Sequence, residues 1–174
     1  MVLLGGEHPA RDYDCAVSDA IRLADALPGD EDAIVALYAE LDAFYGAASP
    51  EGSAAERVSR VRTALFGDPA AGRALLAWDG SVLAGFAGYQ FIWPSSALTV
   101  SLYLKELYVT SAYRRSGAGR RLMDRLLEIA RERGCTRIEW TADTANSGAR
   151  SFYDSLGAAP LTSKLFYRVT LPEG

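Results

Sequence analysis

The sequence predicts an α/β fold in which a mixed central sheet of about six to seven strands carries helices on both faces. The chain has 174 residues, enough for one domain with a full hydrophobic core. Apolar stretches typical of strands are interleaved with stretches of helical period, in the order β-α-α-β-β-β-α-β-α-β. No repeat or internal linker interrupts this order, so the elements are expected to pack as one layered sheet.

Residues 1–15 are expected to form an N-terminal arm, because they contain glycine, proline and charges without a regular period. Residues 16–174 then form a single domain, whose first strand is expected around residues 18–23. The first residues lack the basic start and long apolar core of a signal peptide, and no apolar run approaches the length of a membrane span. The expected location is therefore the cytoplasm.

Two helices are expected after the first strand. One covers residues 31–46, with Asp30 or Asp32 as its N-cap and Gly46 as its stop. The other covers residues 54–67, where the apolar side chains again recur at helical spacing.

Strands dominate the middle of the chain. Residues 73–93 predict a hairpin, because Asp79-Gly80 is a common tight-turn dipeptide between two apolar runs. Residues 97–110 are rich in β-branched and aromatic residues and predict a long strand.

A helix follows this strand and is expected to run to about Arg133, with an apolar stripe formed by Leu122, Met123, Leu126, Leu127 and Ala130. Strands at 135–142 and 161–171 then flank a short helix at 147–157. Residues 100–142 form a strand–helix–strand unit, which predicts a right-handed crossover between parallel strands.

The composition excludes several classes of protein. Hydrophobic residues make up 49% and the formal net charge is −4, which argues against nucleic-acid or membrane partners. Cys15 and Cys135 form no closely spaced pair and suggest a reducing compartment. His8 is the only histidine, so neither a metal site nor a histidine-based catalytic triad is expected.

The turn before the helix that ends near Arg133 carries the strongest functional signal. Gly117 and Gly119 stand at the start of this helix, where unpaired N–H groups and a partial positive charge favour an anion. Glycine also lets a ligand approach the backbone closely. Four arginines flank the pair: Arg114, Arg115, Arg120 and Arg121. The segment predicts a phosphate or pyrophosphate site; the alternative is a purely structural turn with a solvated basic face.

This segment resembles motif A of the GNAT family of N-acetyltransferases, in which Arg114-x-x-Gly117-x-Gly119 follows a strand and opens a helix. The stretch TANSGARSFYDSLGA resembles the family's motif B, with Asn146, Tyr153 and Gly157 in register. The presence of both family motifs, in the right order and at the right spacing, argues against a chance match. The resemblance implies the GNAT fold and an acetyl-CoA-dependent N-acetyltransferase.

Within the family, the chain is most similar to the diamine (spermidine/spermine) acetyltransferases, on the stretches VLAGFAGYQF and LYLKELYVTSAYRR. Those enzymes carry an acidic pair where this chain has Lys105 and Glu106, which weakens the case for a polyamine. Arg115 stands where the family commonly has glycine.

The resemblance implies a set of cofactor-binding residues. The backbone of the strand lines the pantetheine arm, the amides of the turn bind the pyrophosphate, and the motif B residues touch the cofactor. The residues are Leu107, Tyr108, Val109, Arg114, Arg115, Ser116, Gly117, Ala118, Gly119, Arg120, Asn146 and Tyr153. Parallel strands that splay apart would leave backbone N–H groups for this purpose.

Two residues are candidates for proton transfer. Tyr153 is the candidate acid, because a phenol is protonated at neutral pH and can donate to a thiolate; the alternative is a core aromatic packed on Phe152. Glu106 is the candidate base, acting through water; the alternative is an ion pair with an arginine or lysine. Strand alternation puts Glu106 on the face of Leu102, Leu104 and Tyr108, unless a bulge changes the face.

The amine that accepts the acetyl group is the least defined part of the predicted function. Tyr38, Tyr45, Tyr89 and Trp93 either line its pocket or belong to the core. The expected acceptor is a primary amine of a small molecule: a polyamine, an amino acid or an aminoglycoside-like compound. Alternatives are a non-catalytic acyl-CoA sensor or scaffold, and a protein N-terminal or lysine acetyltransferase. The family resemblance also implies a homodimer.

Overall fold

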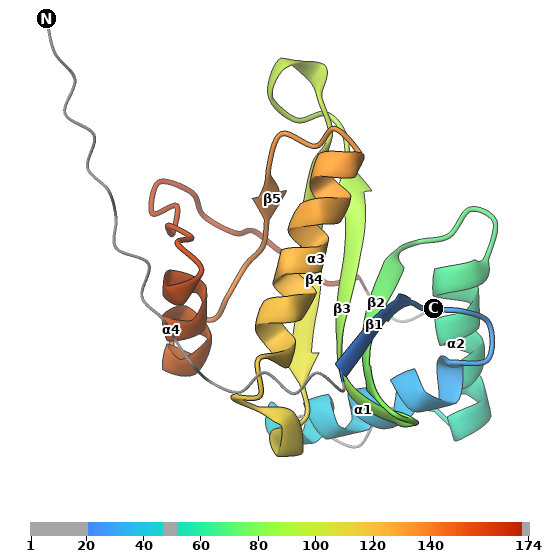
Figure 1. Ribbon diagram of the computed structural model, residues 1–174. Coiled ribbons are helices and arrows are strands. Elements are labelled where there is room, and N and C mark those ends of the chain that lie inside the picture. Colours follow the sequence, from blue (N-terminus) through green and yellow to red (C-terminus); the bar gives the residue numbers. More distant parts are fainter. Residues whose placement is uncertain (1–20, 47–51, 172–174) are drawn as a thin grey trace, which may run out of the picture. The chain divides into compact units, whose positions relative to one another are not determined.

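The computed structural model describes residues 21–46 and 52–171 (Figure 1). They form two compact units, one ending at Trp140 and the other beginning at Thr141. The predicted N-terminal arm, residues 1–15, lies outside the described residues.

The first unit contains a five-stranded mixed sheet in the spatial order β1-β2-β3-β4-β5. The first three pairings are antiparallel, and β4 pairs with β5 in parallel. This confirms the expected hairpin and the parallel strand–helix–strand unit. The strands are β1 (Ile21–Asp25), β2 (Arg73–Asp79), β3 (Val82–Ile92), β4 (Ser101–Val109) and β5 (Ile138–Glu139).

Four α-helices are found in the described residues: α1 (Glu31–Phe44), α2 (Ala54–Phe66), α3 (Ala118–Glu132) and, in the second unit, α4 (Ser147–Ser155). Asp30, rather than Asp32, is the N-cap residue of α1, although its carboxylate accepts from the N–H of Leu27 (2.8 Å) and not from the helix. Ser53 and Glu56 form a capping box at the start of α2. The predicted helices are therefore confirmed, with ends within a few residues of those expected.

The sheet separates two sets of buried side chains. Ile34, Leu37 and Leu41 of α1 pack with Leu76 and Phe86 on one face. Helix α3 contacts four strands of the sheet, and its buried stripe comprises Leu122, Met123, Leu126, Ile129 and Ala130. Leu127 was expected in this stripe, but its side chain is 38% exposed, and Ile129 is buried instead. Successive residues of an α-helix are rotated by about 100° around the helix axis, so Leu127 points away from the face that contains Leu122 and Leu126.

A β-bulge in β4 sets the direction of the candidate base. Gly88 of β3 is paired with Glu106, but the next residue, Tyr89, is paired with Leu104, so Lys105 is an extra residue without a partner. An extra residue breaks the alternation of side chains. Glu106 therefore shares the α1 side of the sheet with Phe86 and Tyr108, whereas Leu102 and Leu104 point to the α3 side. The prediction that Glu106 shares a face with Leu102 and Leu104 is wrong for this reason.

The last parallel strand is much shorter than the 135–142 expected. Strand β5 pairs only with Leu102 and Tyr103 of β4. Within the described part of the chain, β4 from Leu104 to Val109 has no strand partner on that side. The backbone of this segment is consequently open on one edge, as splayed parallel strands require.

The strand expected at residues 161–171 is not formed, so the described residues contain five strands and not six to seven. The segment has the alternating, β-branched composition of a strand, but it pairs with none of the described strands. Its large apolar side chains are exposed by 64–86%: Leu161, Leu165, Phe166, Tyr167, Val169 and Leu171. Composition alone therefore did not decide the conformation here.

Gly85 marks a close approach between β3 and β4. A Cβ atom at this position would lie 2.6 Å from the carbonyl oxygen of Tyr108 and 3.2 Å from Val109 Cα. We expect Gly85→Ala to lower the free energy of unfolding by about 1–3 kcal/mol, because the backbone must move to admit a methyl group. Urea unfolding measures this. Gly72→Ala is the matched control, since its nearest atom would be 3.6 Å away; equal midpoints for the two variants would contradict the expected clash.

Candidate active site

The segment between β4 and α3 is held by side chains from elsewhere in the first unit. Glu40 of α1 accepts from the backbone N–H of Ser111 at 3.2 Å and from its hydroxyl at 3.4 Å. The Tyr113 hydroxyl donates to Asp79 Oδ2 at 2.9 Å, and this bond raises the pKa of the phenol. The turn that follows is thus fixed to helix α1 and to the end of β2.

The predicted glycine turn has the backbone geometry of an anion site. Gly117 is the N-cap residue of α3 with φ +86°, a left-handed conformation that glycine adopts without strain. Arg115 also has a positive φ, +64°, at the position where the family commonly has glycine. The Ala118 N–H is paired with Ser116 Oγ at 3.4 Å. The next N–H groups, of Gly119 and Arg120, belong to the first helical turn and have no acceptor within the helix.

The arginines around the turn do not form one uniform basic face. The guanidinium of Arg114 lies over the ring of Phe44 at 4.4 Å and that of Tyr108 at 5.8 Å. Arg120 pairs with Asp124 one turn along α3, at 3.8 Å. The candidate anion site therefore consists mainly of backbone N–H groups and the helix dipole, with Arg114 as part of the contact between the turn and α1.

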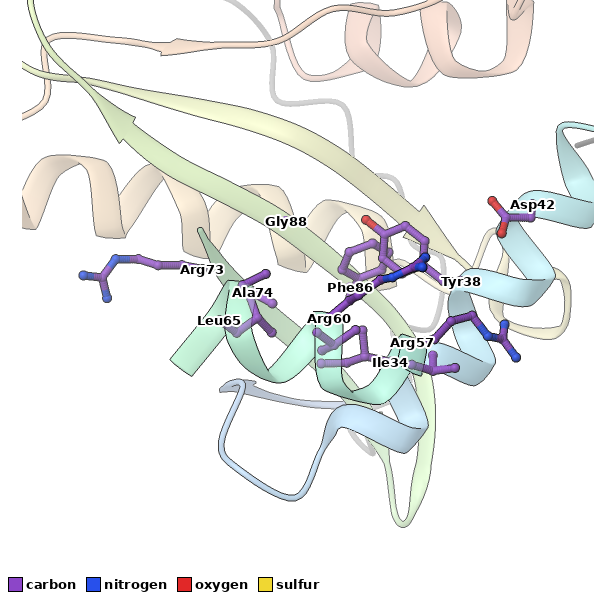
Figure 2. A pocket seen from close by; sticks show the side chains of 13 residues that line it. Ile34, Tyr38, Asp42, Arg57, Arg60, Leu65, Arg73, Ala74, Phe86 and Gly88 are labelled. Atoms are coloured by element: carbon purple, nitrogen blue, oxygen red, sulfur yellow. The ribbon is translucent and has the colours of Figure 1, made fainter. Parts of the chain in front are cut away.

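A cavity of about 590 Å³ lies between α1, α2 and the sheet (Figure 2). This is within the usual size range of small-molecule sites. Its apolar lining includes Ile34, Val61, Leu65 and Phe86, and Gly88 forms part of its floor. Charged side chains also line it: Asp42, Arg57, Arg60 and Arg73.

Glu106 stands beside this cavity. It is paired across the sheet with Gly88, which lines the cavity, and an added Cβ on Gly88 would lie 3.9 Å from Glu106 Cβ. Burial raises the pKa of the Glu106 carboxyl, and the positive charge of Lys105 and the N–H of Leu107 only partly oppose this. Among the ion pairs of the described residues none includes Glu106, so the paired alternative does not account for its position.

Of the four aromatic residues considered for the acceptor pocket, only Tyr38 lines the cavity. Its ring packs against Phe86 with centroids 5.1 Å apart. Tyr89 is buried and packs against Phe91, and Tyr45 and Trp93 are 59% and 65% exposed. Burial and the nearby carboxylates of Glu106 and Asp42 raise the pKa of Tyr38 to about 12.

Sequence reasoning missed four charged residues of the cavity: Asp42, Arg57, Arg60 and Arg73. A signal was present for Arg57. It lies four residues before Val61 and eight before Leu65, so an arginine occupies the apolar stripe of α2. A charge in an apolar stripe needs a partner or a use.

The motif B residues lie in the second unit. Asn146 is the N-cap residue of α4, and its Oδ1 accepts from the N–H of Ala149 at 3.0 Å, so the side chain caps this helix. Tyr153 is half-buried on the same helix, and its ring packs on Phe152 with centroids 5.3 Å apart. Gly157 follows the helix with φ +77°. The structure thus brings Glu106, the 107–109 backbone and the glycine turn together in one unit, and Asn146 and Tyr153 together in the other.

Comparison with known proteins identifies this arrangement. The model of the acetyltransferase (GNAT) family matches residues 34–158, which include most of α1, the residues that line the cavity, the glycine turn and α4. The chain belongs to the GNAT acetyltransferase family. Motif A of this GNAT chain forms the end of β4, the turn and the start of α3, and motif B forms α4.

Several GNAT relatives are similar to this chain. It is 32% identical over 84 residues to thialysine N-epsilon-acetyltransferase of Sus scrofa, covering 48% of this chain and 49% of the relative. It is 30% identical over 156 residues to D-amino-acid N-acetyltransferase of Saccharomyces cerevisiae, covering 87% and 92%. The chain spans about half the length of several of the curated relatives it matches.

A solved structure agrees with the GNAT fold. An integron cassette protein from the mobile metagenome of V. cholerae superposes with a TM-score of 0.79 at 27% identity, covering 87% of this chain and 93% of that one. In the described part of this GNAT chain, no helix is long and apolar enough to cross a membrane. The same residues contain no group of three or more histidine, cysteine or acidic side chains placed to hold a metal ion.

Proposed function

We propose that this chain transfers the acetyl group of acetyl-CoA to a primary amine of a small molecule. The observation that carries the proposal is the half-buried carboxylate of Glu106, which stands beside a cavity of small-molecule size in the unit that also holds the glycine turn. A site for a phosphate and a site for a small organic molecule thus lie on one sheet. We infer that both units belong to one acetyltransferase domain, because the family match extends across both.

The residues of the turn fit a pyrophosphate. The left-handed Gly117 removes a side chain from the helix start, and the N–H groups of Gly119 and Arg120 face outward from the first turn. The open backbone of Leu107–Val109 offers amide groups to the pantetheine arm. Acetyl-CoA, when bound, supplies an activated acetyl thioester. Asn146 is proposed to contact the cofactor in addition to capping α4.

Proton transfer is assigned to two side chains. Glu106, with its raised pKa, takes a proton from the ammonium group of the acceptor through a water molecule. The Tyr153 hydroxyl donates a proton to the departing thiolate sulfur. The bulge at Lys105 supports the first assignment, because it places the carboxylate on the side of the sheet where the cavity lies.

The acceptor is proposed to bind in the cavity. The two curated relatives named above act on thialysine and on D-amino acids, both of which carry amines. The structure gives less support to a polyamine, because Lys105 and two arginines bring positive charge to the region.

We further propose that the chain is a homodimer in the cytoplasm. The support for a dimer is the number of large apolar side chains exposed within residues 161–171, since such side chains are often covered at an interface. Light scattering coupled to gel filtration gives the mass directly.

The test of the proposed activity is release of CoA thiol from acetyl-CoA across a panel of amines. We expect thiol release that depends on the amine, and mass spectrometry should find the acetylated amine. Acetyl-CoA binding without transfer to any amine in the panel would instead support the acyl-CoA sensor.

Gly119→Val is expected to lower the affinity for acetyl-CoA at least tenfold, about 1.4 kcal/mol, because the new side chain fills the space of the phosphates. Gly117→Val should have at least this effect, since its φ of +86° adds backbone strain. Calorimetric titration measures the affinity, with Gly72→Val as a control away from the turn. Unchanged affinity in folded variants would move the cofactor site elsewhere.

A further inference from the structure

The cavity beside Glu106 carries charges of both signs. Asp42 and Tyr38 lie one turn apart on α1 and both line the cavity, and Glu106 of β4 is paired with Gly88, which lines it as well. Arg57 and Arg60 project from α2, which forms the other wall (Figure 2). Asp42 and the two guanidinium groups therefore come from different walls of one cavity, and Glu106 lies beside it.

Of the two α2 arginines that line the cavity, Arg57 is the one whose surroundings point to a bound anion. Its Nε is buried and has no hydrogen-bond partner among the described residues. A guanidinium N–H that is removed from water without an acceptor lowers stability, and native proteins rarely retain such a group without a use. An anionic oxygen from a bound molecule would satisfy it, and guanidinium groups bind carboxylates in a planar, two-point geometry.

The other two arginines contribute differently. Arg60 lies one turn after Arg57 and adds a second positive charge to the same wall, although it also acts on Glu56 and lowers the pKa of that carboxyl. Arg73 lines the cavity with part of its side chain, but its guanidinium lies over the ring of Phe91 at 5.8 Å. Phe91 is paired with Leu102, on the α3 side of the sheet. The anion subsite is thus formed by α2 alone.

We propose that the acceptor amine also carries a carboxylate, which Arg57 and Arg60 bind while the amine lies toward Glu106 and Asp42. This inference rests on the proposed acetyl transfer and names its class of substrate: an amino acid or a similar zwitterion. A diamine of the same length satisfies the acidic wall but places a second positive charge against two guanidinium groups. Like charges at close range disfavour such a ligand, so the same residues exclude polyamines.

The experiment compares molecules that differ only in the carboxylate. Lysine and cadaverine form one such pair, and ornithine and putrescine form another. With the unaltered protein, we expect kcat/KM to be at least tenfold higher for the amino acid of each pair. Arg57→Met keeps the length of the side chain and removes the guanidinium. It should raise KM for lysine at least tenfold with little change in kcat, and leave kcat/KM for cadaverine unchanged or higher.

Arg131→Met is the matched control, because Arg131 lies on the exposed surface of α3, and it should change neither ratio. Transfer to the diamines with no preference for the amino acids would overturn this inference and leave the acetyltransferase activity standing. So would an equal loss for both members of a pair in Arg57→Met. Absence of transfer to any amine of either class would overturn the proposed activity itself, and the inference with it. If Arg57→Met does not fold, the ratio of kcat/KM for lysine to that for cadaverine, measured with the unaltered protein, still tests the inference.

Discussion

Replacing Tyr153 by phenylalanine is expected to lower the turnover rate by roughly 10²–10⁴. The change removes one hydroxyl and nothing else. The ring contact with Phe152, with centroids 5.3 Å apart, remains possible, so α4 should keep its packing. Because the hydroxyl is proposed to protonate the departing thiolate, its loss should appear in kcat and not in the affinity for acetyl-CoA.

Pre-steady-state kinetics should first establish that chemistry limits turnover, since a slow product release would hide the effect. Tyr167→Phe is the matched control, because it removes a phenolic hydroxyl from the same unit at a side chain that is 83% exposed. A Tyr153→Phe rate within about twofold of the unaltered protein, with chemistry limiting, would make this tyrosine a packing residue.

Glu106→Gln is expected to lower the rate about 10²-fold near neutral pH. Burial raises the pKa of the Glu106 carboxyl, so the base form becomes populated only as the pH rises through that raised value. Above it, and below the pKa of the acceptor amine, the unaltered protein has both a base and a protonated substrate. The variant lacks the base in this window. Its deficit should shrink as the pH approaches the pKa of an alkyl amine, about 10, where the free amine is already present.

The measurement is the pH dependence of kcat/KM for both proteins. The acidic limb that reports Glu106 should disappear in the variant. Glu132→Gln, which removes a carboxylate from the exposed end of α3, should keep the profile of the unaltered protein. An unchanged profile in Glu106→Gln would assign the base to another group or to bulk water.

The elements with strong local signals were predicted correctly. The Asp79-Gly80 turn lies between β2 and β3, and Gly117 is the N-cap residue of α3 with the left-handed backbone that only glycine adopts easily. These features depend on a few neighbouring residues, so a single sequence contains them. The two motifs, together with their strand and helix context, were sufficient to indicate the GNAT family.

Features that depend on distant residues were not predicted. The 161–171 segment has the composition of a strand, but a strand forms only where another edge accepts it. The cavity is made by α1, α2 and two strands, and none of these segments alone indicates that Asp42 and Arg57 line the same space. The short β5 likewise depends on where two chain segments separate and not on the residues within it.

The unpaired residue in β4 has a consequence for how this strand tolerates change. Because Lys105 is exposed and has no partner in β3, the identity of its side chain matters little to the sheet. As an unpaired extra residue, it lets Leu104 and Glu106 face opposite sides of the sheet although one residue separates them. Deleting it would make Leu104 and Glu106 direct neighbours, which strict alternation also places on opposite faces. The position is thus permissive both to substitution and to deletion, and the pairing of Glu106 with Gly88 is what keeps the carboxylate beside the cavity.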